Sequence, residues 1–448
     1  MFNNQEMKSK IFTAQNKQII WFGSLMTIIF LLLFFIEPLI KLCRITNFNL
    51  NEVFIIYIIV VCLLLFALVV YHLTYRQLTK TSINIKVIFF FFILFNLILL
   101  FIWPITTTDL FSYIAYSRVF SQYQANPLTT PYANFSTDLF RPYLFNDWSV
   151  YPTPYAPLFI YLTSFLNLIG GVNFILTVFI YKLFFVLANL FTGYLIYKIW
   201  QNPLITFLYC WHPLINFEIA ANAHNDILTL IFLVISLYFL FKKTGGLKNY
   251  SLTWCFLILS ALIKFIPFIF LPILFLVIWK QLPDKHKISY SLLLVLLVII
   301  LLLIFFLPFL SGNTFNHLFL LIHSNHPLLI ANAPLIIILA GLLKIFRQYD
   351  FLNLAILISK FFFLLFYTFL IIKLALQVKK LEKVDFIKYS VIALLIFLFA
   401  FVNFIYPWYI LNLIVLLILL AGVNKDNKFY SYVFYLSIYA ITLYIYIR

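Results

Sequence analysis

The chain has 448 residues, of which 65% are hydrophobic, 21% aromatic and only 10% charged. Apolar stretches of about eighteen residues or more recur from one end to the other, and these are long enough to cross a bilayer as helices. A soluble globular domain would alternate apolar and polar faces, so the composition excludes that class. We therefore expect an all-α polytopic membrane protein that forms a single domain over residues 1–448.

The charge is distributed unevenly along the chain. The net charge is +17, from 30 Lys and Arg against 13 Asp and Glu. The cations gather in short connectors such as "YRQLTK", "FKKTGGLK", "KQLPDKHK" and "QVKKLEKVDFIK". Cytoplasmic membrane loops have this distribution under the positive-inside rule, so we do not expect a nucleic-acid partner.

The first three predicted helices lead to a large polar loop. A basic N-terminus precedes a full-length apolar span at about 19–40, so we expect an uncleaved first helix and a cytoplasmic N-terminus. Spans at about 51–71 and 84–104 then place residues 105–152 outside the cell membrane. This is the longest polar stretch in a chain of short connectors, and it is therefore a candidate extracytoplasmic catalytic loop.

The remaining predicted elements follow from keeping the basic connectors in the cytoplasm. Residues 153–170 become an interfacial or re-entrant helix, 218–226 surface outside, and 249–279 form a hairpin of two short helices. The turn of that hairpin falls at "IKFIPF" and places Lys264 well inside the membrane. Further helices are predicted at about 288–310, 330–346, 351–376, 387–404, 408–423 and 429–447. The total is about eleven to thirteen transmembrane helices, with interfacial helices in the outside loop.

The stretch "TTTDLFSYIAYSRVF", residues 106–120, opens the outside loop. Thr106 and Asp109 have the spacing of a capping box, which predicts a helix start at the membrane surface. Asp109, Ser112 and Tyr113 share one face of that amphipathic helix. Two interpretations of Asp109 remain: it caps the positive end of the helix, or it is a general base that takes a proton from an attacking hydroxyl.

The same loop contains two arginines, Arg118 and Arg141. Either guanidinium can hold a phosphate through a forked contact. An ordinary salt bridge with Asp138 or Asp147 explains them equally well. Prolines and tyrosines in the loop predict rigid turns with aromatic rings, which suit a sugar face or the aromatic belt of any membrane protein.

A second polar island, "WHPLINFEIAANAHNDILTL", lies between two apolar spans and contains Glu218, His224, Asn225 and Asp226. Acids at a membrane edge are costly and tend to mark functional sites. Asn225 or Asp226 is predicted at the start of the following helix, but capping explains only one of these side chains. Lys264 either extends to an interface or neutralises an anionic lipid phosphate.

Metal and nucleotide sites are not favoured by the sequence. His317, His323 and His326 have no cysteine or acid nearby in the chain, so a zinc site is not expected. Four scattered cysteines without CxxC spacing indicate small core residues. Neither a Walker-type glycine loop nor a serine nucleophile elbow occurs.

The series "TTTDLFSYIAYSRVF", "NPL", "HPLINFEIAANAHND", "LIKFIPFIFLPI" and "NFIYPWYILNLIVLL" resembles membrane glycosyltransferases of the GT-C superfamily. The resemblance is closest to bacterial polyprenol-phosphate-mannose-dependent mannosyltransferases and covers about residues 85–420. It implies a GT-C-like helical bundle and inverting sugar transfer from a polyprenyl-phosphate donor on the outer face, with Asp109 as the catalytic base. Two features depart from the pattern: three predicted spans precede Asp109, and Gln124-Ala125 replaces a glycine before "NP".

The resemblance also implies roles for the other candidate residues. Lys264, with Arg118 or Arg141, would neutralise the departing lipid phosphate, and the polar residues near Asp109 would hold sugar or acceptor hydroxyls. Besides Asp109, the predicted site comprises Tyr113, Arg118, Arg141, Glu218, His224, Asn225, Asp226 and Lys264. The expected partners are the lipid-linked sugar, a glycan or glycolipid acceptor and the bilayer. We expect no cofactor and favour metal-independent catalysis, although the sequence leaves metal dependence open.

Two rival functions stay open at this point. A transporter or flippase of a lipid-linked or anionic substrate would use Glu218, Asp226 and Lys264 as intramembrane charges and would not need Asp109. A glycan polymerase or ligase would be expected to rely on several arginines in the outside loop, where only two occur. The donor sugar is expected to be mannose, and the sequence does not determine the acceptor or the linkage.

Overall fold

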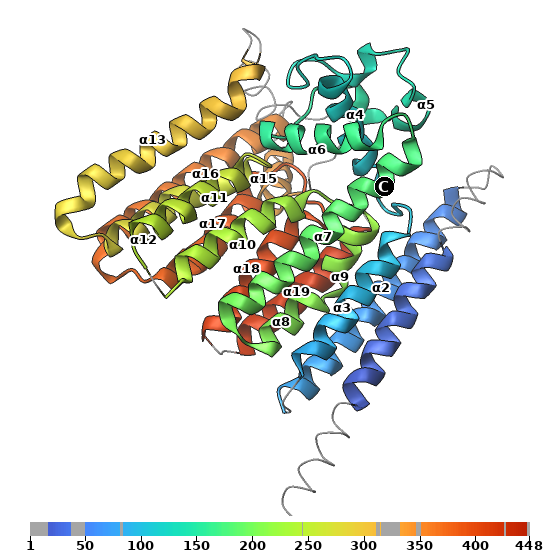
Figure 1. The fold of residues 1–448 in the computed structure, drawn as a ribbon, viewed down its shortest axis with the longest axis horizontal. Coiled ribbons are helices and arrows are strands. Elements are labelled where there is room, and N and C mark those ends of the chain that lie inside the picture. The colour runs from blue at the N-terminus through green and yellow to red at the C-terminus, as the bar shows by residue number, and fades with distance from the viewer. Residues whose placement is uncertain are drawn as a thin grey trace, which may run out of the picture.

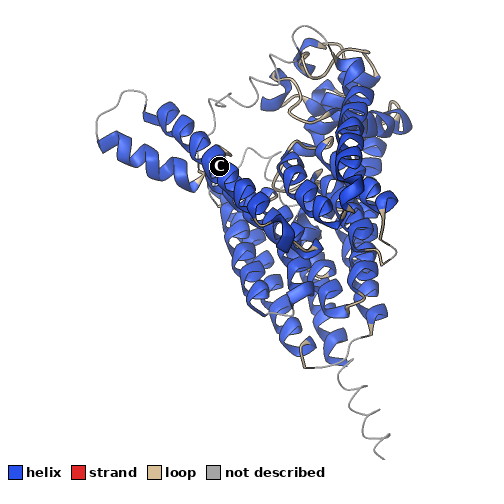
Figure 2. Ribbon diagram, turned by 90° about the vertical axis from the view of Figure 1, so that its left-hand side faces the viewer, coloured by secondary structure: helices blue, strands red, loops and turns tan. Residues whose placement is uncertain are grey.

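The computed structural model shows a helical bundle with a group of short helices at one end (Figures 1 and 2). It describes residues 17–36, 50–80, 84–243, 245–310, 314, 332–345, 351–424 and 427–445. Within those ranges the chain is almost entirely helical and no strand occurs, which confirms the predicted all-α fold. His317, His323 and His326 lie outside the described residues.

The helices follow one another with short connections. A first helix, Lys17–Ile36, precedes the labelled elements. The N-terminal half then contains α2 (Leu50–Leu78), α3 (Ile85–Leu100), α4 (Asp109–Ser121), α5 (Arg141–Leu144), α6 (Pro157–Gly170), α7 (Phe174–Trp200), α8 (Pro203–Cys210), α9 (Pro213–Asn216) and the π-helix η3 (Phe217–Ala221). The C-terminal half contains α10 (Asp226–Phe241), α11 (Leu247–Ala261), η4 (Ile266–Phe270), α12 (Leu271–Gln281), α13 (Lys287–Phe306), α15 (Pro334–Ile345), α16 (Phe351–Leu376), α17 (Lys383–Ala400), α18 (Tyr409–Asn424) and α19 (Asn427–Leu443).

Five described helices are long and apolar enough to cross a bilayer alone. A sixth span results if α8 and the continuous α9–η3 segment, bent by 50° from each other, cross together. Six further apolar helices have 10–17 residues, which is shorter than a full crossing needs. The polytopic architecture is therefore present, but much of the predicted total of eleven to thirteen consists of short or broken helices. Such helices are tolerated at membrane depth where they pack against protein or line a polar site.

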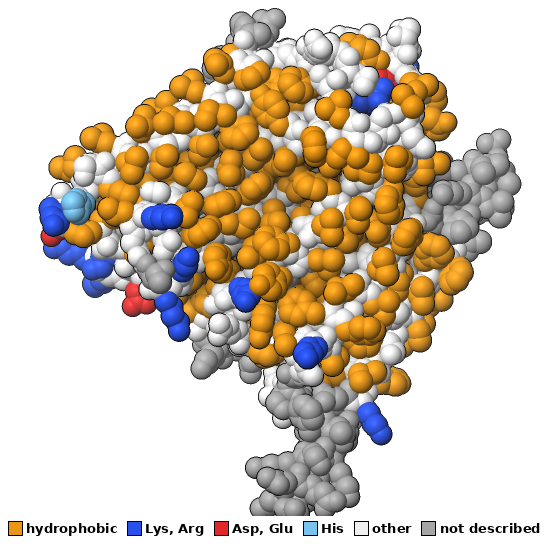
Figure 3. Space-filling view, viewed as in Figure 1, with side chains coloured by type: hydrophobic (Ala, Val, Ile, Leu, Met, Phe, Trp, Pro, Cys, Tyr) orange, Lys and Arg blue, Asp and Glu red, His pale blue; other side chains and the backbone are white. Residues whose placement is uncertain are grey.

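The outer surface of the bundle is apolar, as expected for contact with lipid. Figure 3 shows hydrophobic side chains over most of the visible face, with Lys and Arg side chains gathered along its lower edge. Among the five helices that can cross a bilayer alone, the one that contains α13 is the least buried, with only 11% of its apolar stretch inside the protein. Leu292 is 66% exposed and Leu303 is 51% exposed, so this face of α13 meets the hydrocarbon of the bilayer.

Buried amides join four helices in the centre of the bundle. Asn96 on α3 donates to Oδ1 of Asn216 at 2.8 Å, and Asn189 on α7 donates to Oδ1 of Asn96 at 2.9 Å. The hydroxyl of Tyr209 on α8 donates to Oδ1 of Asn189 at 2.6 Å. Lipid offers apolar side chains the same environment as a protein core, so interhelical hydrogen bonds of this kind fix which helices associate.

The predicted hairpin over 249–279 is confirmed as α11 followed by η4 and α12. The carbonyl oxygens of its turn, at Leu262 and Ile263, accept hydrogen bonds from the N–H groups of Leu158 and Ala156 at 3.0 and 3.2 Å. The turn is thereby held against the first residues of α6, which is the predicted interfacial or re-entrant helix. Because α6 packs against α4, this contact brings Lys264 to the end of the bundle that contains these two helices. Figure 1 shows α4 and α6 together at that end.

The start of α4 differs from the prediction. The helix begins at Asp109 itself, and Thr107 Oγ1 accepts the Asp109 N–H at 3.0 Å, so the predicted capping box with Thr106 is wrong. Thr106 is occupied elsewhere, because its hydroxyl accepts a hydrogen bond from Asn222 at 2.7 Å. The helix is also more deeply buried than expected of an amphipathic helix in the membrane interface: residues 112–119 are all buried, and the packing of α6 against α4 contributes to this burial.

One ion pair organises the core of the outer loop. The guanidinium of Arg118 contacts both oxygens of Asp138 at 2.9–3.0 Å and lies 4.0 Å from the centre of the Phe140 ring. Asp138 also accepts hydrogen bonds from the hydroxyls of Tyr123 and Tyr132 at 2.7 and 2.9 Å, and from the Phe140 N–H at 2.7 Å. Because its lone pairs are widely satisfied, this buried carboxylate can stabilise the loop.

This cluster makes the stability of the loop depend on pH. Burial raises the pKa of the Asp138 carboxyl, but the hydrogen bonds from Arg118, Tyr123 and the Phe140 N–H outweigh it and hold the pKa below its usual range. A depressed folded-state pKa contributes stability that is complete above the unfolded pKa of about 4 and is lost as the pH falls through the folded value. We therefore expect pepsin to cleave the 105–156 loop of the wild type increasingly as the pH falls below about 4. Asp138→Asn should already be cleaved more readily at pH 4–5 and should lack this step; equal resistance of the two proteins would contradict the assignment.

Candidate functional site

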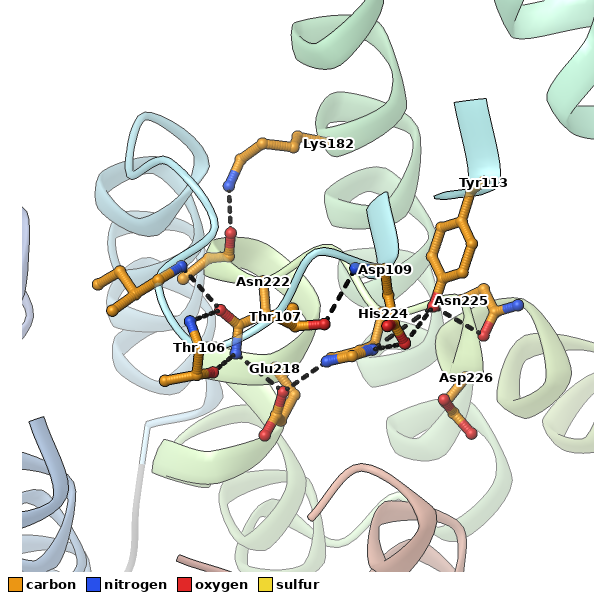
Figure 4. A network of polar contacts seen from close by, with 12 residues as sticks. Thr106, Thr107, Asp109, Tyr113, Lys182, Glu218, Asn222, His224, Asn225 and Asp226 are labelled. Atoms are coloured by element: carbon orange, nitrogen blue, oxygen red, sulfur yellow. Dashed lines mark hydrogen bonds and ion pairs between the residues drawn. The ribbon is translucent and has the colours of Figure 1, made fainter. Parts of the chain in front are cut away.

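The candidate site lies where four segments meet at one end of the bundle. Asp109 begins α4, Glu218 is on η3, His224 is in the connection to α10, and Lys264 is at the turn of the helical hairpin. Figure 4 shows the side chains of Asp109, Glu218 and His224 converging on one another. Every described residue from 217 to 226 is buried, so this segment packs inside the protein beside Asp109.

The backbone of this segment departs from regular helix at two points. Phe217–Ala221 is a π-helix, a form that appears mostly as short insertions and often at functional sites. Ala223 has a φ of 59°, in the left-handed region that residues with a Cβ seldom occupy. The chain turns there, which places the His224 side chain between α4 and η3. The following helix has Asn225 at its N-cap position and Asp226 as its first residue, as predicted.

The centre of the site is an imidazole between two carboxylates. Nδ1 of His224 lies 3.5 Å from Oδ2 of Asp109, and Nε2 lies 3.1 Å from Oε2 of Glu218. Both contacts are electrostatic; the hydrogen-bonding partner of Nδ1 within the described residues is the Tyr113 hydroxyl, at 3.5 Å. The His224 ring also stacks on Trp408 at 4.1 Å with an angle of 20° between the planes. The imidazole is thus fixed in position and orientation by contacts from three elements.

Asn222 connects the segment that precedes Asp109 with η3. Its Nδ2 donates to Oε2 of Glu218 at 3.0 Å and to the Thr106 hydroxyl at 2.7 Å. Its Oδ1 accepts the N–H groups of Ile105 and Thr106 at 3.2 and 3.4 Å. One buried amide therefore sets the position of Glu218 and of the segment that leads to Asp109.

A buried lysine secures the same region. The ammonium of Lys182 on α7 donates to the carbonyl oxygens of Ile102 and Ala221, both at 2.6 Å. Figure 4 shows one of these bonds, to the backbone of η3. These carbonyls follow the C-terminal end of α3 and end η3, where a cation is electrostatically favourable. Lys182 was not predicted as part of the site.

Exposure distinguishes Asp109 from its neighbours. The Asp109 side chain is 18% exposed, whereas those of Glu218 and His224 are 0% exposed. Two other polar atoms in the cluster, Glu218 Oε1 and Asn225 Nδ2, are buried and make no hydrogen bond within the described part of the chain. An orphaned buried group of this kind costs about 1–3 kcal/mol, which a water or a ligand hydroxyl would relieve. Asp109 is the carboxylate of this cluster that an incoming molecule can reach.

Lys264 forms a second charged pair beside the first. Its Nζ lies 3.0 and 3.1 Å from the two oxygens of Asp226, and 4.7 Å from the centre of the Tyr409 ring. Asn412 on α18 donates to Oδ1 of Asp226 at 3.2 Å. A lysine ammonium has three N–H donors, so one is available for a further oxygen while Asp226 is held by the other two.

Tyrosines surround the accessible carboxylate. The Tyr113 hydroxyl donates to Oδ2 of Asp109 at 3.4 Å. Burial raises the pKa of Tyr116, Tyr155 and Tyr406, and the negative charge of Asp109 raises each of them further. These phenols therefore stay protonated at neutral pH. The Tyr116 hydroxyl donates to the Trp148 carbonyl oxygen at 3.2 Å.

The structure brings most of the predicted site residues together. The assembled set comprises Asp109, Tyr113, Glu218, His224, Asn225, Asp226 and Lys264. Arg118 instead makes the salt bridge with Asp138, one of the two alternatives that the sequence left open. Arg141 donates to the carbonyl oxygen of Ala133 at 3.1 Å and covers the Phe145 ring.

Sequence reasoning missed several supporting residues. Asn222 lies inside the polar island that the sequence marked, so its position was a usable signal. Lys182, Trp408 and Asn412 are polar or aromatic residues within long apolar runs, and only tertiary contacts assign them to this site.

Comparison with known protein families gives the site a chemical context. Residues 33–280, more than half of the chain, match the model of the MptA_B family, described as alpha-(1→6)-mannopyranosyltransferase, N-terminal domain. The match includes Asp109, Glu218 and Lys264. No curated protein and no solved structure was found to match the chain. The chain therefore belongs to the MptA_B family of alpha-(1→6)-mannopyranosyltransferases, a GT-C-type family, and is a membrane mannosyltransferase.

Proposed function

We propose that this mannosyltransferase moves a mannosyl group from a polyprenyl-phosphate donor to a glycan or glycolipid acceptor, with inversion and with Asp109 as the general base. The observation that carries the proposal is the accessibility of Asp109, 18% exposed, at the end of a chain of otherwise fully buried groups, His224 and Glu218. A general base must reach the proton that it removes and must be held in position for it. Asp109 meets both requirements.

The proposed reaction is a single displacement. The acceptor hydroxyl gives its proton to Asp109 while its oxygen forms a bond to the anomeric carbon of the mannosyl group. The bond from that carbon to the phosphate oxygen breaks, and polyprenyl phosphate leaves with the electron pair. Inversion that yields the alpha product of the family description requires a β-linked donor, and a (1→6) linkage requires a primary acceptor hydroxyl.

Lys264 is the proposed partner of the leaving phosphate. Negative charge grows on the bridging oxygen as the bond breaks, and a fixed cation in a site of low dielectric stabilises it. Lys264 is 12% exposed at its side chain and is held by Asp226. The Tyr113 hydroxyl donates to Oδ1 of Asn225 at 3.4 Å, and these two residues are the proposed contacts for sugar hydroxyls. The reaction needs no nucleotide site.

The proposed active site is extracytoplasmic. Lys and Arg side chains gather at the lower edge of the molecule in Figure 3, whereas α4 and α6 lie at the upper end in the matching view of Figure 1. The positive-inside rule assigns the basic edge to the cytoplasm. On this assignment the protein is a multi-pass protein of the cell membrane, with its N-terminus inside and Asp109 outside.

Replacement of the base tests the mechanism directly. Asp109→Asn keeps the shape of the side chain but cannot accept the proton, so we expect the rate with polyprenyl-phosphate mannose to fall at least about 100-fold. Donor affinity, measured by equilibrium binding to the purified protein, should change by less than about threefold. Asp284→Asn, at a side chain that is 94% exposed beside α13, is the matched control and should keep full activity. An Asp109→Asn protein with undiminished turnover would eliminate Asp109 as the general base.

The contact between His224 and Asp109 gives His224 a positioning role, which a double-mutant cycle tests. His224→Gln should lower kcat at least about tenfold in the wild type, because the Asp109 carboxylate is no longer oriented. In the Asp109→Asn background the same substitution should cost little more, since both changes act through one group. Losses that multiply in the double variant would show that His224 acts independently of Asp109.

The proposed displacement uses protein groups alone and includes no metal-dependent step. We expect EDTA followed by gel filtration to leave the transfer rate of the purified protein within about twofold of its initial value. Addition of Mg²⁺ or Mn²⁺ should not raise it further. A rate that is abolished by chelation and restored by one of these ions would require a metal in the mechanism.

A further inference from the structure

The segment between α17 and α18 brings aromatic rings to the site from beyond the residues that match the family model. Tyr406 stacks on Trp408 at 4.5 Å with an angle of 12° between the planes, and Trp408 stacks in turn on His224 at 4.1 Å. Trp408 is 6% exposed and belongs to the core, whereas Tyr406, at the other end of this stack, is half-buried and has the Phe404 ring 4.6 Å away. The rings of Trp408 and Tyr406 therefore form an aromatic surface that extends away from the His224 ring, which contacts Asp109.

Tyr409 extends that surface toward the second charged pair. Its ring lies 5.4 Å from the Tyr406 ring, at an angle of 76°, and 4.7 Å from the Lys264 ammonium. Like Tyr406, it is half-buried. The two rings, here called the tyrosine wall, thus connect the surroundings of Asp109 with those of Lys264.

The tyrosine wall is held rigidly. Asn332 bonds the backbone of Ile405 in both directions, with its Oδ1 accepting the Ile405 N–H at 2.5 Å and its Nδ2 donating to the Ile405 carbonyl at 3.1 Å. The Tyr409 N–H donates to the Tyr406 carbonyl at 3.1 Å, which closes a turn over Pro407 and Trp408. A surface fixed in this way before binding loses little conformational entropy when a ligand docks on it.

The geometry of an inverting displacement places the transferred sugar beside this wall. The acceptor oxygen, the anomeric carbon and the leaving phosphate oxygen must lie roughly in line, with the base at one end and the cation at the other. If Asp109 is the base and Lys264 the cation, the pyranose ring occupies the space between them. The tyrosine wall extends along that same direction.

We propose that Tyr406 and Tyr409 form the binding surface for the mannosyl ring of the donor. A pyranose has an apolar face of C–H groups and a rim of hydroxyls. An aromatic ring with a phenolic hydroxyl matches both parts, because the ring contacts the C–H face and the hydroxyl donates to the rim. This inference rests on the proposed function, since it takes the positions of the base and the phosphate from it.

The experiment compares a ligand that carries the sugar with one that lacks it. We would measure equilibrium binding of polyprenyl-phosphate mannose and of polyprenyl phosphate to the full-length Asp109→Asn protein, which holds the donor without consuming it. Addition of Tyr406→Leu should weaken binding of the mannosylated lipid about tenfold and leave binding of polyprenyl phosphate unchanged. Tyr406→Phe, which keeps the ring, should lose less than Tyr406→Leu. Tyr435→Leu, at a ring that is 67% exposed on α19, is the matched control.

The outcomes separate this inference from the proposed function. Equal weakening of both lipids would mean that the wall contacts the phosphate or the lipid chain, and unchanged binding of both would leave the wall without a role in donor recognition. Either result overturns the inference while the Asp109 mechanism stands. Failure of the unsubstituted protein to bind or use the mannosylated lipid would instead overturn the proposed function, and the inference with it.

Discussion

The contact of one buried imidazole with two carboxylates is the constraint around which this site is arranged. Acidic groups removed from water are costly unless other groups compensate them. Glu218 and His224 are fully buried, and the structure supplies Asn222, Trp408 and Asp109 around them. Asn222 belongs to the same segment as Glu218 and His224, whereas Asp109 and Trp408 come from two others, so the contacts of these buried groups bring three segments together. The carboxylate left at the exposed end of this arrangement is the one assigned to the chemistry.

Broken helices make that convergence possible inside an apolar bundle. A continuous helix through 203–221 would carry Glu218 past the site, whereas the 50° bend and the π-helix direct it inward. The hairpin of α11 and α12 is a second break of this kind, and its turn brings Lys264 to Asp226. The backbone groups freed by these breaks are bonded to Lys182 and to the start of α6. These helices are shorter or more bent than a straight membrane-spanning helix, and their breaks bring the charged side chains to the site.

The sequence predicted the features that depend on residues close to one another along the chain. Apolar length and basic connectors predicted the helix at 351–376 and the hairpin whose turn holds Lys264, and scarce acids in oily surroundings marked Asp109 and Glu218. The missed features depend on contacts between distant residues. Thr106 had the spacing of a helix cap, but it forms a hydrogen bond with Asn222, 116 positions away in the chain. The residues of α4 predicted an amphipathic helix because the local sequence carries no information about the helix that packs over it. Likewise, the local sequence could not decide whether Arg118 binds a phosphate or Asp138.

The left-handed backbone at Ala223 connects the stability of the protein to its activity. A residue with a Cβ in that conformation is disfavoured by about 1–2 kcal/mol, and the surrounding contacts must hold it there. Glycine at this position would relieve the strain in the folded state, but it would also give the backbone before His224 more conformational freedom. Glycine at position 223 would therefore favour stability, whereas alanine favours a fixed orientation of the imidazole. Selection for stability alone and selection for activity alone would lead to different residues at this position.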